Sequence, residues 1–273
     1  MNRRHRSCAR AAFAIGLAVV ALSLIWLALA PQLTRAANLS VGSDGTYATI
    51  QAAIDAASPG DTIQVRDETF NESLIIAKSV TLLGGYASGF ASRTPRSTTV
   101  GNVPARVIDI QGAGIEVTLD GFEIANGMTG DDGGGIFVDV EDDSIVTIND
   151  NFIHDNTGGN GGGVYADVEN RSELHITGND VMTNTSFDDY AGVYAGVSLS
   201  GTLAVTDNDI VGNESGDRYG GLSAYVEGLS QFHIEDNLVM SNTTAVDGNP
   251  LAPYRYYGGL YFQASYNSHG SFD

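Results

Sequence analysis

The sequence predicts an all-β fold, a right-handed parallel β-helix with a short capping α-helix near its N-terminus. The first observation is a glycine-rich phrase that occurs five times, as GGGIFVDV (133–140), GGGVYADV (161–168), AGVYAGV (191–197), GGLSAYV (220–226) and GGLYFQA (258–264). An asparagine phrase follows the first four copies at a constant offset of 16 residues, and successive units lie 28 or 29 residues apart. Such a fixed period indicates a solenoid. Within a unit, apolar residues alternate with period two, which indicates strands, and the crossover rule favours the right hand.

Residues 1–36 have the pattern of an export signal. Arginines at positions 3, 4, 6 and 10 precede an uncharged apolar stretch, Ala11 to Ala30, and small residues follow at Ala36 and Ala37. This order is typical of a Sec-type signal peptide, so we expect an extracellular or cell-surface protein. The apolar stretch is also long enough to cross a bilayer, which leaves an uncleaved membrane anchor as the alternative.

The remaining chain is strongly acidic. Residues 1–36 contain five arginines and no acid, so residues 37–273 carry 8 basic and 33 acidic residues, a formal net charge of −25. This charge disfavours nucleic acid and anionic lipid as partners. Cys8 is the only cysteine and precedes the apolar stretch, so the exported chain has no disulfide.

A helix is predicted at the start of the repeat region. In TYATIQAAIDAASPG, Thr49 is a candidate N-cap, apolar residues from Ile50 to Ala57 share one face, and Pro59-Gly60 ends the helix. We expect this helix to cover the first coil. Strand-like segments TIQV, SLIIA and SVTLLGG follow. The β-helix domain is therefore assigned to residues 37–273. Because a fifth glycine phrase begins a coil just before Asp273, we expect the chain to be a fragment of a longer product.

The repeated asparagines are expected to be structural. Stacked coils lie about 4.8 Å apart, so equivalent side chains can form an amide ladder. The predicted ladder consists of Asn151, Asn179, Asn208 and Asn237.

Several segments carry a family resemblance. TIQAAIDAASPGDTIQV, SVTLLGGY, LDGFEIANG and the GGGIFV and NDNFIHDN repeats resemble secreted bacterial right-handed parallel β-helix proteins of the pectin-lyase-like superfamily. The glycine repeats are more loosely similar to those of chlamydial polymorphic outer-membrane proteins. The resemblance covers nearly all of residues 38–273. It implies an extracellular protein that meets polysaccharide, in a superfamily that includes lyases, hydrolases, esterases and adhesins.

Most enzymatic motifs of that superfamily are missing. TFNES, with Phe70 and Glu72, resembles the first motif of pectinesterases, but their downstream catalytic motifs have no match. The Gly-His-Gly and Arg-x-Lys elements of polygalacturonases are also missing. Arg171 and Arg218, which could be compared with a lyase base, fall in turn-like segments. The sequence thus favours a binding protein, with a polysaccharide lyase or hydrolase, or a structural stalk or adhesin, as the alternatives.

An aromatic face is the candidate binding site. The alternation points Phe137, Tyr165, Tyr194 and Tyr261 outward at equivalent positions, with Ser223 as an interruption. The adjoining loops vary in length, and insertions in a solenoid often line its binding side. These loops add Tyr190, Tyr219, Tyr254, Arg255, Tyr256 and Tyr257. We expect this face to bind polysaccharide, while a stabilising aromatic ladder is the alternative for the strand residues.

Carboxylates repeat in the same loops. Asp131, Asp188 and Asp217 each stand four residues before an equivalent glycine of the repeated phrase, namely Gly135, Gly192 and Gly221. Stacked carboxylates repel one another unless solvated or bridged, and extracellular calcium is a possible bridge. Gly159 interrupts the column, however, so a solvated acidic surface is the alternative. No other cofactor is expected.

Overall fold

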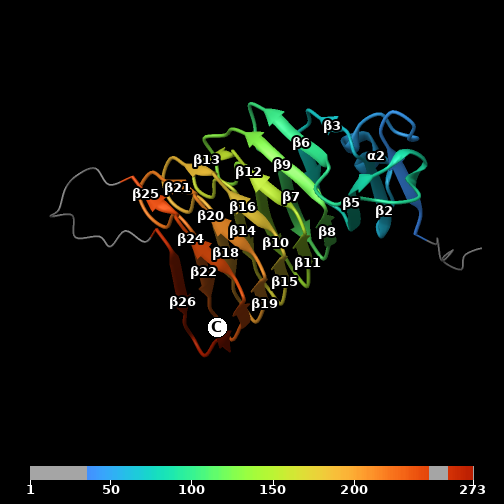
Figure 1. The fold of residues 1–273 in the computed structure, drawn as a ribbon. Coiled ribbons are helices and arrows are strands. Elements are labelled where there is room, and N and C mark those ends of the chain that lie inside the picture. Colours follow the sequence, from blue (N-terminus) through green and yellow to red (C-terminus); the bar gives the residue numbers. More distant parts are fainter. Residues whose placement is uncertain (1–35, 246–257, 273) are drawn as a thin grey trace, which may run out of the picture. The chain divides into compact units, whose positions relative to one another are not determined.

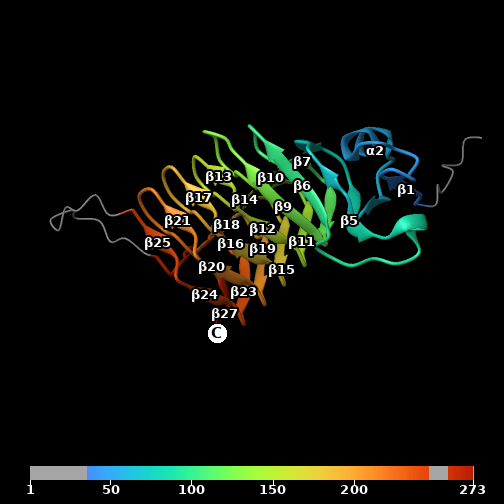
Figure 2. The same ribbon diagram turned by 45° about the horizontal axis from the view of Figure 1, so that its top comes forward.

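The computed structural model describes residues 36–245 and 258–272. Parallel strands from successive coils stack on one another in sequence order, as the colours of Figures 1 and 2 show. This arrangement confirms the predicted parallel β-helix. The predicted export segment, residues 1–36, lies almost wholly outside the described residues. Among the residues that are described, no helix is both long and apolar enough to span a membrane.

The described strands form four parallel sheets. Sheet A contains β1 (Asn38–Val41), β2 (Asp61–Arg66), β5 (Val80–Tyr86), β8 (Glu116–Asp120), β11 (Ile145–Asn149), β15 (Glu173–Thr177), β19 (Thr202–Thr206), β23 (Gln231–Glu235) and β27 (His269–Phe272). Sheet B contains β3 (Thr69–Phe70), β6 (Thr98–Val103), β9 (Phe122–Gly127), β12 (Phe152–His154), β16 (Asp180–Met182), β20 (Asp209–Val211) and β24 (Leu238–Met240). Sheet C contains β4 (Leu74–Ile76), β7 (Ile108–Ala113), β10 (Ile136–Glu141), β14 (Val164–Val168), β18 (Val193–Val197), β22 (Leu222–Val226) and β26 (Leu260–Ala264). Sheet D contains β13 (Thr157–Gly158), β17 (Thr185–Ser186), β21 (Glu214–Ser215) and β25 (Thr243–Thr244).

One turn of the chain visits the sheets in a fixed order. The coil that begins at β10 in sheet C continues through β11 in sheet A, β12 in sheet B and β13 in sheet D, and β14 returns to sheet C. The repeat pattern predicts only three strands per coil. The additional strand is the two-residue strand of sheet D, which is too short to give a periodic signal in the sequence.

The core follows the predicted alternation. In β10, Ile136, Val138 and Val140 are buried, whereas Phe137 is half-buried and Asp139 is exposed. The same pattern in β14 places Val164, Ala166 and Val168 inside. Because each coil covers the apolar side chains of its neighbours, burial of this continuous column drives folding.

Helix α2 (Ile50–Ala56) lies at the N-terminal end of the described β-helix and packs on β1, β2 and β4. The Thr49 hydroxyl accepts from the Ala52 amide at 3.3 Å, as its N-cap position predicts. Glu72 also caps the helix, since its carboxylate accepts from the amides of Ile50 and Gln51 at 2.9 and 3.1 Å. A short 3-10 turn, η1 (Ser88–Phe90), follows β5.

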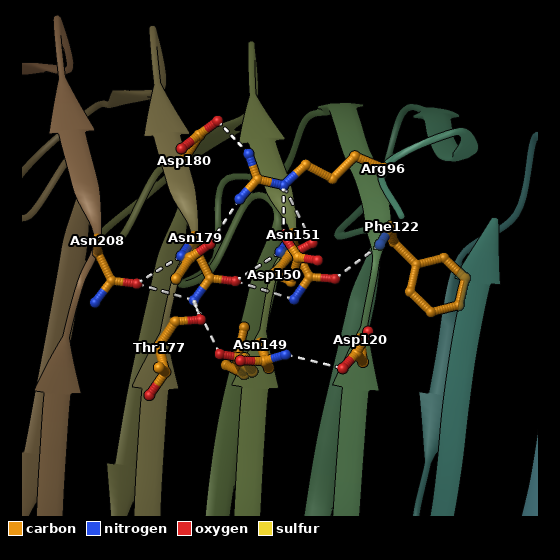
Figure 3. Close-up of polar contacts among 12 residues, drawn as sticks. Arg96, Asp120, Phe122, Asn149, Asp150, Asn151, Thr177, Asn179, Asp180 and Asn208 are labelled. Atoms are coloured by element: carbon orange, nitrogen blue, oxygen red, sulfur yellow. Dashed lines mark hydrogen bonds and ion pairs between the residues drawn. The ribbon is translucent and has the colours of Figure 1, made fainter. Parts of the chain in front are cut away.

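Asparagine side chains stack in two columns, one at the turns that follow sheet A (Figure 3) and one at the turns that follow sheet B. Asn151 Nδ2 donates to Asn179 Oδ1 at 3.1 Å, and Asn179 Nδ2 donates to Asn208 Oδ1 at 3.0 Å. Asn208 Nδ2 continues the column to Asn237 Oδ1 at 2.9 Å. A second column is formed in the same way by Asn156, Asn184, Asn213 and Asn242. The amides thereby satisfy backbone groups that would otherwise be buried without partners.

A single arginine ties neighbouring coils together beside the first asparagine column (Figure 3). Arg96 Nε donates to Asp150 Oδ1 at 3.0 Å, and Arg96 Nη2 donates to the Gly178 carbonyl at 2.6 Å. Its guanidinium also pairs with Asp180. One side chain thus links the loop before β6 to the turns of two later coils.

Candidate ligand-binding face

The outward aromatic residues of sheet C lie in one column. Phe137 pairs with Tyr165, Tyr165 with Tyr194, Tyr194 with Ser223, and Ser223 with Tyr261. The rings of Phe137 and Tyr165 stack with their centroids 5.8 Å apart, and those of Tyr165 and Tyr194 stack at 4.5 Å. These distances are typical of favourable aromatic pairs.

The N-terminal end of this column is covered by a cation. The Arg106 guanidinium lies 4.1 Å from the centroid of the Phe137 ring. Its Nη1 donates to Asp109 Oδ2 at 2.6 Å. The first ring of the column is therefore closed off on the side away from Tyr165.

Two loop tyrosines join the column from the bend that precedes sheet C. The Tyr190 ring lies 4.7 Å from that of Tyr194 and stacks almost parallel to that of Tyr219 at 5.2 Å. The Tyr219 ring in turn lies 4.7 Å from that of Tyr261, and Tyr219 is only 8 % exposed. The structure thus brings the two loop tyrosines onto the strand tyrosines.

The backbone of these two loop tyrosines is strained. Tyr190 and Tyr219 have φ values of 66° and 63°, in the left-handed region. The equivalent positions of the two preceding coils are Gly133 and Gly161, with φ values of 71° and 62°. A left-handed conformation costs a residue with a side chain about 1–2 kcal/mol. The chain bears this cost in the two coils where a loop tyrosine packs on the strand tyrosines of sheet C.

Tyr225 belongs to the same cluster, although it lies outside the in-register column that the repeat predicts. Its ring lies 5.5 Å from that of Tyr194 and 5.3 Å from that of Tyr261. Tyr225 stands two residues after Ser223 in β22, so it shares the outer face and fills the aromatic gap from a diagonal position. Comparing diagonal neighbours as well as residues in register would have found it. We call this set the tyrosine face: Phe137, Tyr165, Tyr190, Tyr194, Tyr219, Tyr225 and Tyr261.

The phenols of Tyr165, Tyr194 and Tyr225 remain protonated at neutral pH. Burial raises the pKa of Tyr165 to about 12, and the nearby Asp132 and Asp167 carboxylates contribute. Burial likewise raises the pKa of Tyr194 and Tyr225 far above the ordinary value of 10. The face therefore offers neutral hydroxyls, which can donate and accept hydrogen bonds, beside apolar rings.

The segment between β25 and β26 contains the other predicted binding residues. Tyr254, Arg255, Tyr256 and Tyr257 lie outside the described residues.

The predicted calcium ligands occupy one position of the stacked coils, with Gly159 between Asp131 and Asp188. The Gly159 amide donates to the Asp131 carbonyl, the Asp188 amide to the Gly159 carbonyl, and the Asp217 amide to the Asp188 carbonyl. The three aspartates are exposed. No group of three or more acidic, histidine or cysteine side chains is placed to hold a metal ion in the described part of the chain. Calcium binding stays a prediction.

The residues compared with catalytic groups make structural contacts. Arg171 Nη2 pairs with Asp143 Oδ2 at 2.7 Å, and Arg218 Nη2 pairs with Asp189 Oδ2 at 2.6 Å. Glu72 holds the N-terminus of α2, as described above. Each of these groups therefore has a partner in the fold.

The parallel coils and the aromatic column on their outer face define a β-solenoid. A family model for the right-handed β-helix region matches residues 94–268, which include most of the four sheets and all of the tyrosine face. The chain therefore belongs to the right-handed β-helix family, and the predicted hand is confirmed. No curated protein and no solved structure matches the chain.

Proposed function

We propose that this protein is exported, to the cell surface or the medium, and binds extended polysaccharide along the tyrosine face. The observation that carries the proposal is the unbroken contact of aromatic rings from β10 to β26, together with the left-handed backbone of Tyr190 and Tyr219. Residues 1–36 support export, since they have the pattern of a signal peptide.

The tyrosine face suits a sugar polymer for two physical reasons. Rings at coil spacing on a rigid sheet are ordered before binding, which reduces the entropy that binding must overcome. Tyrosine also combines an apolar ring with a hydroxyl, so it can contact both the faces and the hydroxyls of sugars. Weak contacts repeated along the strip make affinity rise with ligand length.

A purely structural role is the competing explanation. Packed cross-strand rings stabilise a sheet without any ligand. The conformation of Tyr190 and Tyr219 is consistent with a binding role, because Gly133 and Gly161 occupy the same position in other coils without strain. Residues such as Thr183 and Leu229, however, adopt this conformation in ordinary turns. Strained residues concentrate at functional sites, where the strain is balanced by a useful geometry.

The experiment compares two glycine variants. A glycan array, followed by calorimetry on the oligosaccharides that bind, would use wild type, Tyr190→Gly and Tyr266→Gly. Tyr266 is the matched control, since it also has a positive φ of 52° but is 77 % exposed in the turn after β26. We expect Tyr190→Gly to lower affinity at least tenfold and Tyr266→Gly to leave it unchanged.

The same variant separates binding from packing. Because the loss of ring contacts in Tyr190→Gly is offset by relief of about 1–2 kcal/mol of backbone strain, its melting temperature should stay close to that of wild type. If no glycan binds, or if Tyr190→Gly binds glycans as well as wild type does, the tyrosine face only stabilises the fold. The proposed binding function is then wrong, and a role as a structural stalk is favoured.

A further inference from the structure

A hollow opens on the outer face of sheet C, next to the tyrosine face. It lies where β14, β18 and β22 end, and its volume is about 170 Å³. Its walls combine three carboxylates with two tyrosine rings and several uncharged polar groups, and these principal lining residues are Asp167, Glu169, Glu227, Tyr194, Tyr225 and Gln263.

A glycine keeps this hollow open. Gly196 lies between Asp167 of β14 and Tyr225 of β22 in the strand register. A Cβ atom at this position would lie 2.6 Å from Asp167 Oδ1 and 3.0 Å from Tyr194 Oη. The space above Gly196 is therefore what admits the carboxylate of Asp167 beside the hydroxyl of Tyr194.

The carboxylate of Asp167 has no cationic partner within the described residues. Burial, followed by the negative charges of Glu169, Asp139 and Glu227, raises its pKa to about 6. None of the lining residues is basic. At neutral pH the hollow thus holds several negative charges that nothing in its walls balances, so it attracts a cation.

The arrangement favours an organic cation over a metal ion. In the described part of the chain, no three acidic, histidine or cysteine side chains converge as a metal ion requires. The walls do provide the rings of Tyr194 and Tyr225, and aromatic faces attract ammonium groups as well as sugar rings. An ammonium carried on a sugar ring can donate to Asp167 while the ring lies against a tyrosine.

We propose that this hollow binds the ammonium group of an amino sugar within the glycan that lies along the tyrosine face. The proposal rests on the proposed function and specifies its ligand class. Asp167 and Glu227 recognise the charge, and Tyr194 and Tyr225 contact the ring. A glycan whose amines are acetylated lacks the charge and leaves Asp167 unpaired, which costs affinity.

The test uses two probes of equal length, a glucosamine hexamer and an N-acetylglucosamine hexamer. Calorimetry at pH 6.5 would compare wild type, Asp167→Asn and Asp207→Asn. Asp207 is the charge-matched control, because it is exposed in the turn before β20, and its φ of 57° suits asparagine. We expect the glucosamine hexamer to bind wild type at least tenfold more tightly than the acetylated one. Asp167→Asn should abolish this preference and Asp207→Asn should retain it.

The pH dependence gives a second readout. The groups facing Asp167 are Asp139 of β10, Glu169 after β14, Glu227 after β22, and the tyrosines of β18 and β22. Since protonation of Asp167 removes its charge, the preference for the glucosamine hexamer should fall between pH 7 and pH 5 in wild type. In Asp167→Asn the preference should follow only the ionisation of the probe's own amines, so the difference between the two proteins at each pH isolates the contribution of Asp167.

The outcomes distinguish this inference from the proposed function. Equal binding of both hexamers, an unchanged preference in Asp167→Asn, or binding of other glycans but neither hexamer would overturn the inference alone. If no glycan on the array binds wild type, both the inference and the proposed function are wrong.

Discussion

The asparagine columns and the tyrosine face both repeat a residue type at coil spacing, yet they differ in how strictly they repeat it. In the first column, from Asn151 to Asn237, every coil supplies the same side chain, and the second column is equally regular. On sheet C, Ser223 interrupts the rings and Gly196 interrupts the polar residues beside them. Buried amides must satisfy one another in every coil, whereas the surface can vary, and its interruptions shape a hollow.

One substitution should disrupt the buried asparagine column. Asn208 Oδ1 accepts from the backbone N and the Nδ2 of Asn179, and Asn208 Nδ2 donates to Ile176 O, Thr206 O and Asn237 Oδ1. Asn208→Ala leaves several of these buried groups unpaired, so we expect a loss of about 3 kcal/mol in the free energy of unfolding. Urea titration would measure it. Asp207→Asn, at the exposed neighbouring position, is the control. An equally small effect of the two substitutions would show that the asparagine column does not stabilise the fold.

On the surface, Asp167 is expected to lower the free energy of unfolding at neutral pH. Its pKa is raised from an ordinary 3.8 to about 6, so its contribution to stability is complete below about pH 4 and is lost as pH rises through 6. A two-unit shift corresponds to about 3 kcal/mol at most, and partial exposure reduces the expected effect to about 1–2 kcal/mol.

Asp167→Asn should therefore be more stable than wild type at pH 7 by this amount, and the two should converge near pH 4. Thermal or urea unfolding of both proteins across this range measures the difference. A difference that does not change with pH would show that Asp167 keeps an ordinary pKa.

The exposed aspartate column is a third repeat and should show the smallest effect. Asp188 and Asp217 lie in adjacent loops, whereas Gly159 separates Asp188 from Asp131. Because exposed carboxylates are solvated and screened, we expect calcium and magnesium at equal ionic strength to change the melting temperature by the same small amount. A rise specific to calcium would instead identify a bridging ion and support the sequence prediction.

The regular parts of the fold were readable from the sequence. The 28- or 29-residue period, the strand alternation and the Thr49 N-cap all depend on local patterns, and each has its counterpart in the structure. The two-residue strands of sheet D were not predicted, since neighbouring coils define them and no pattern within one coil does. The capping role of Glu72 also depends on a contact between residues distant in sequence.

The candidate site was only partly readable. Residues in register, such as Tyr165 and Tyr194, follow directly from the repeat. Tyr225 was missed because it joins the rings diagonally, and the left-handed backbone of Tyr190 was not anticipated because tyrosine does not favour that conformation, although glycine occupies the equivalent position in two other coils. The hollow over Gly196 depends on a side chain that one coil lacks, so it appears only when the coils are stacked.

Each asparagine column also has a direction. Every Oδ1 accepts from the coil before it, and the first of them, Asn151 Oδ1, accepts from the Phe122 amide at 2.9 Å (Figure 3). Each Nδ2 also donates to a backbone carbonyl of the preceding coil, as Asn151 Nδ2 does to Leu119 O, so it is the side-chain carbonyls that give the column its direction. The aligned amide dipoles add along the solenoid axis, as peptide dipoles do in a helix, with the partial negative charge at the end nearer Phe122. The solenoid is therefore electrically polar along its length. If two solenoids were stacked end to end, their asparagine columns could continue across the junction only in a head-to-tail arrangement. A two-fold symmetric junction would place like ends of the dipoles together.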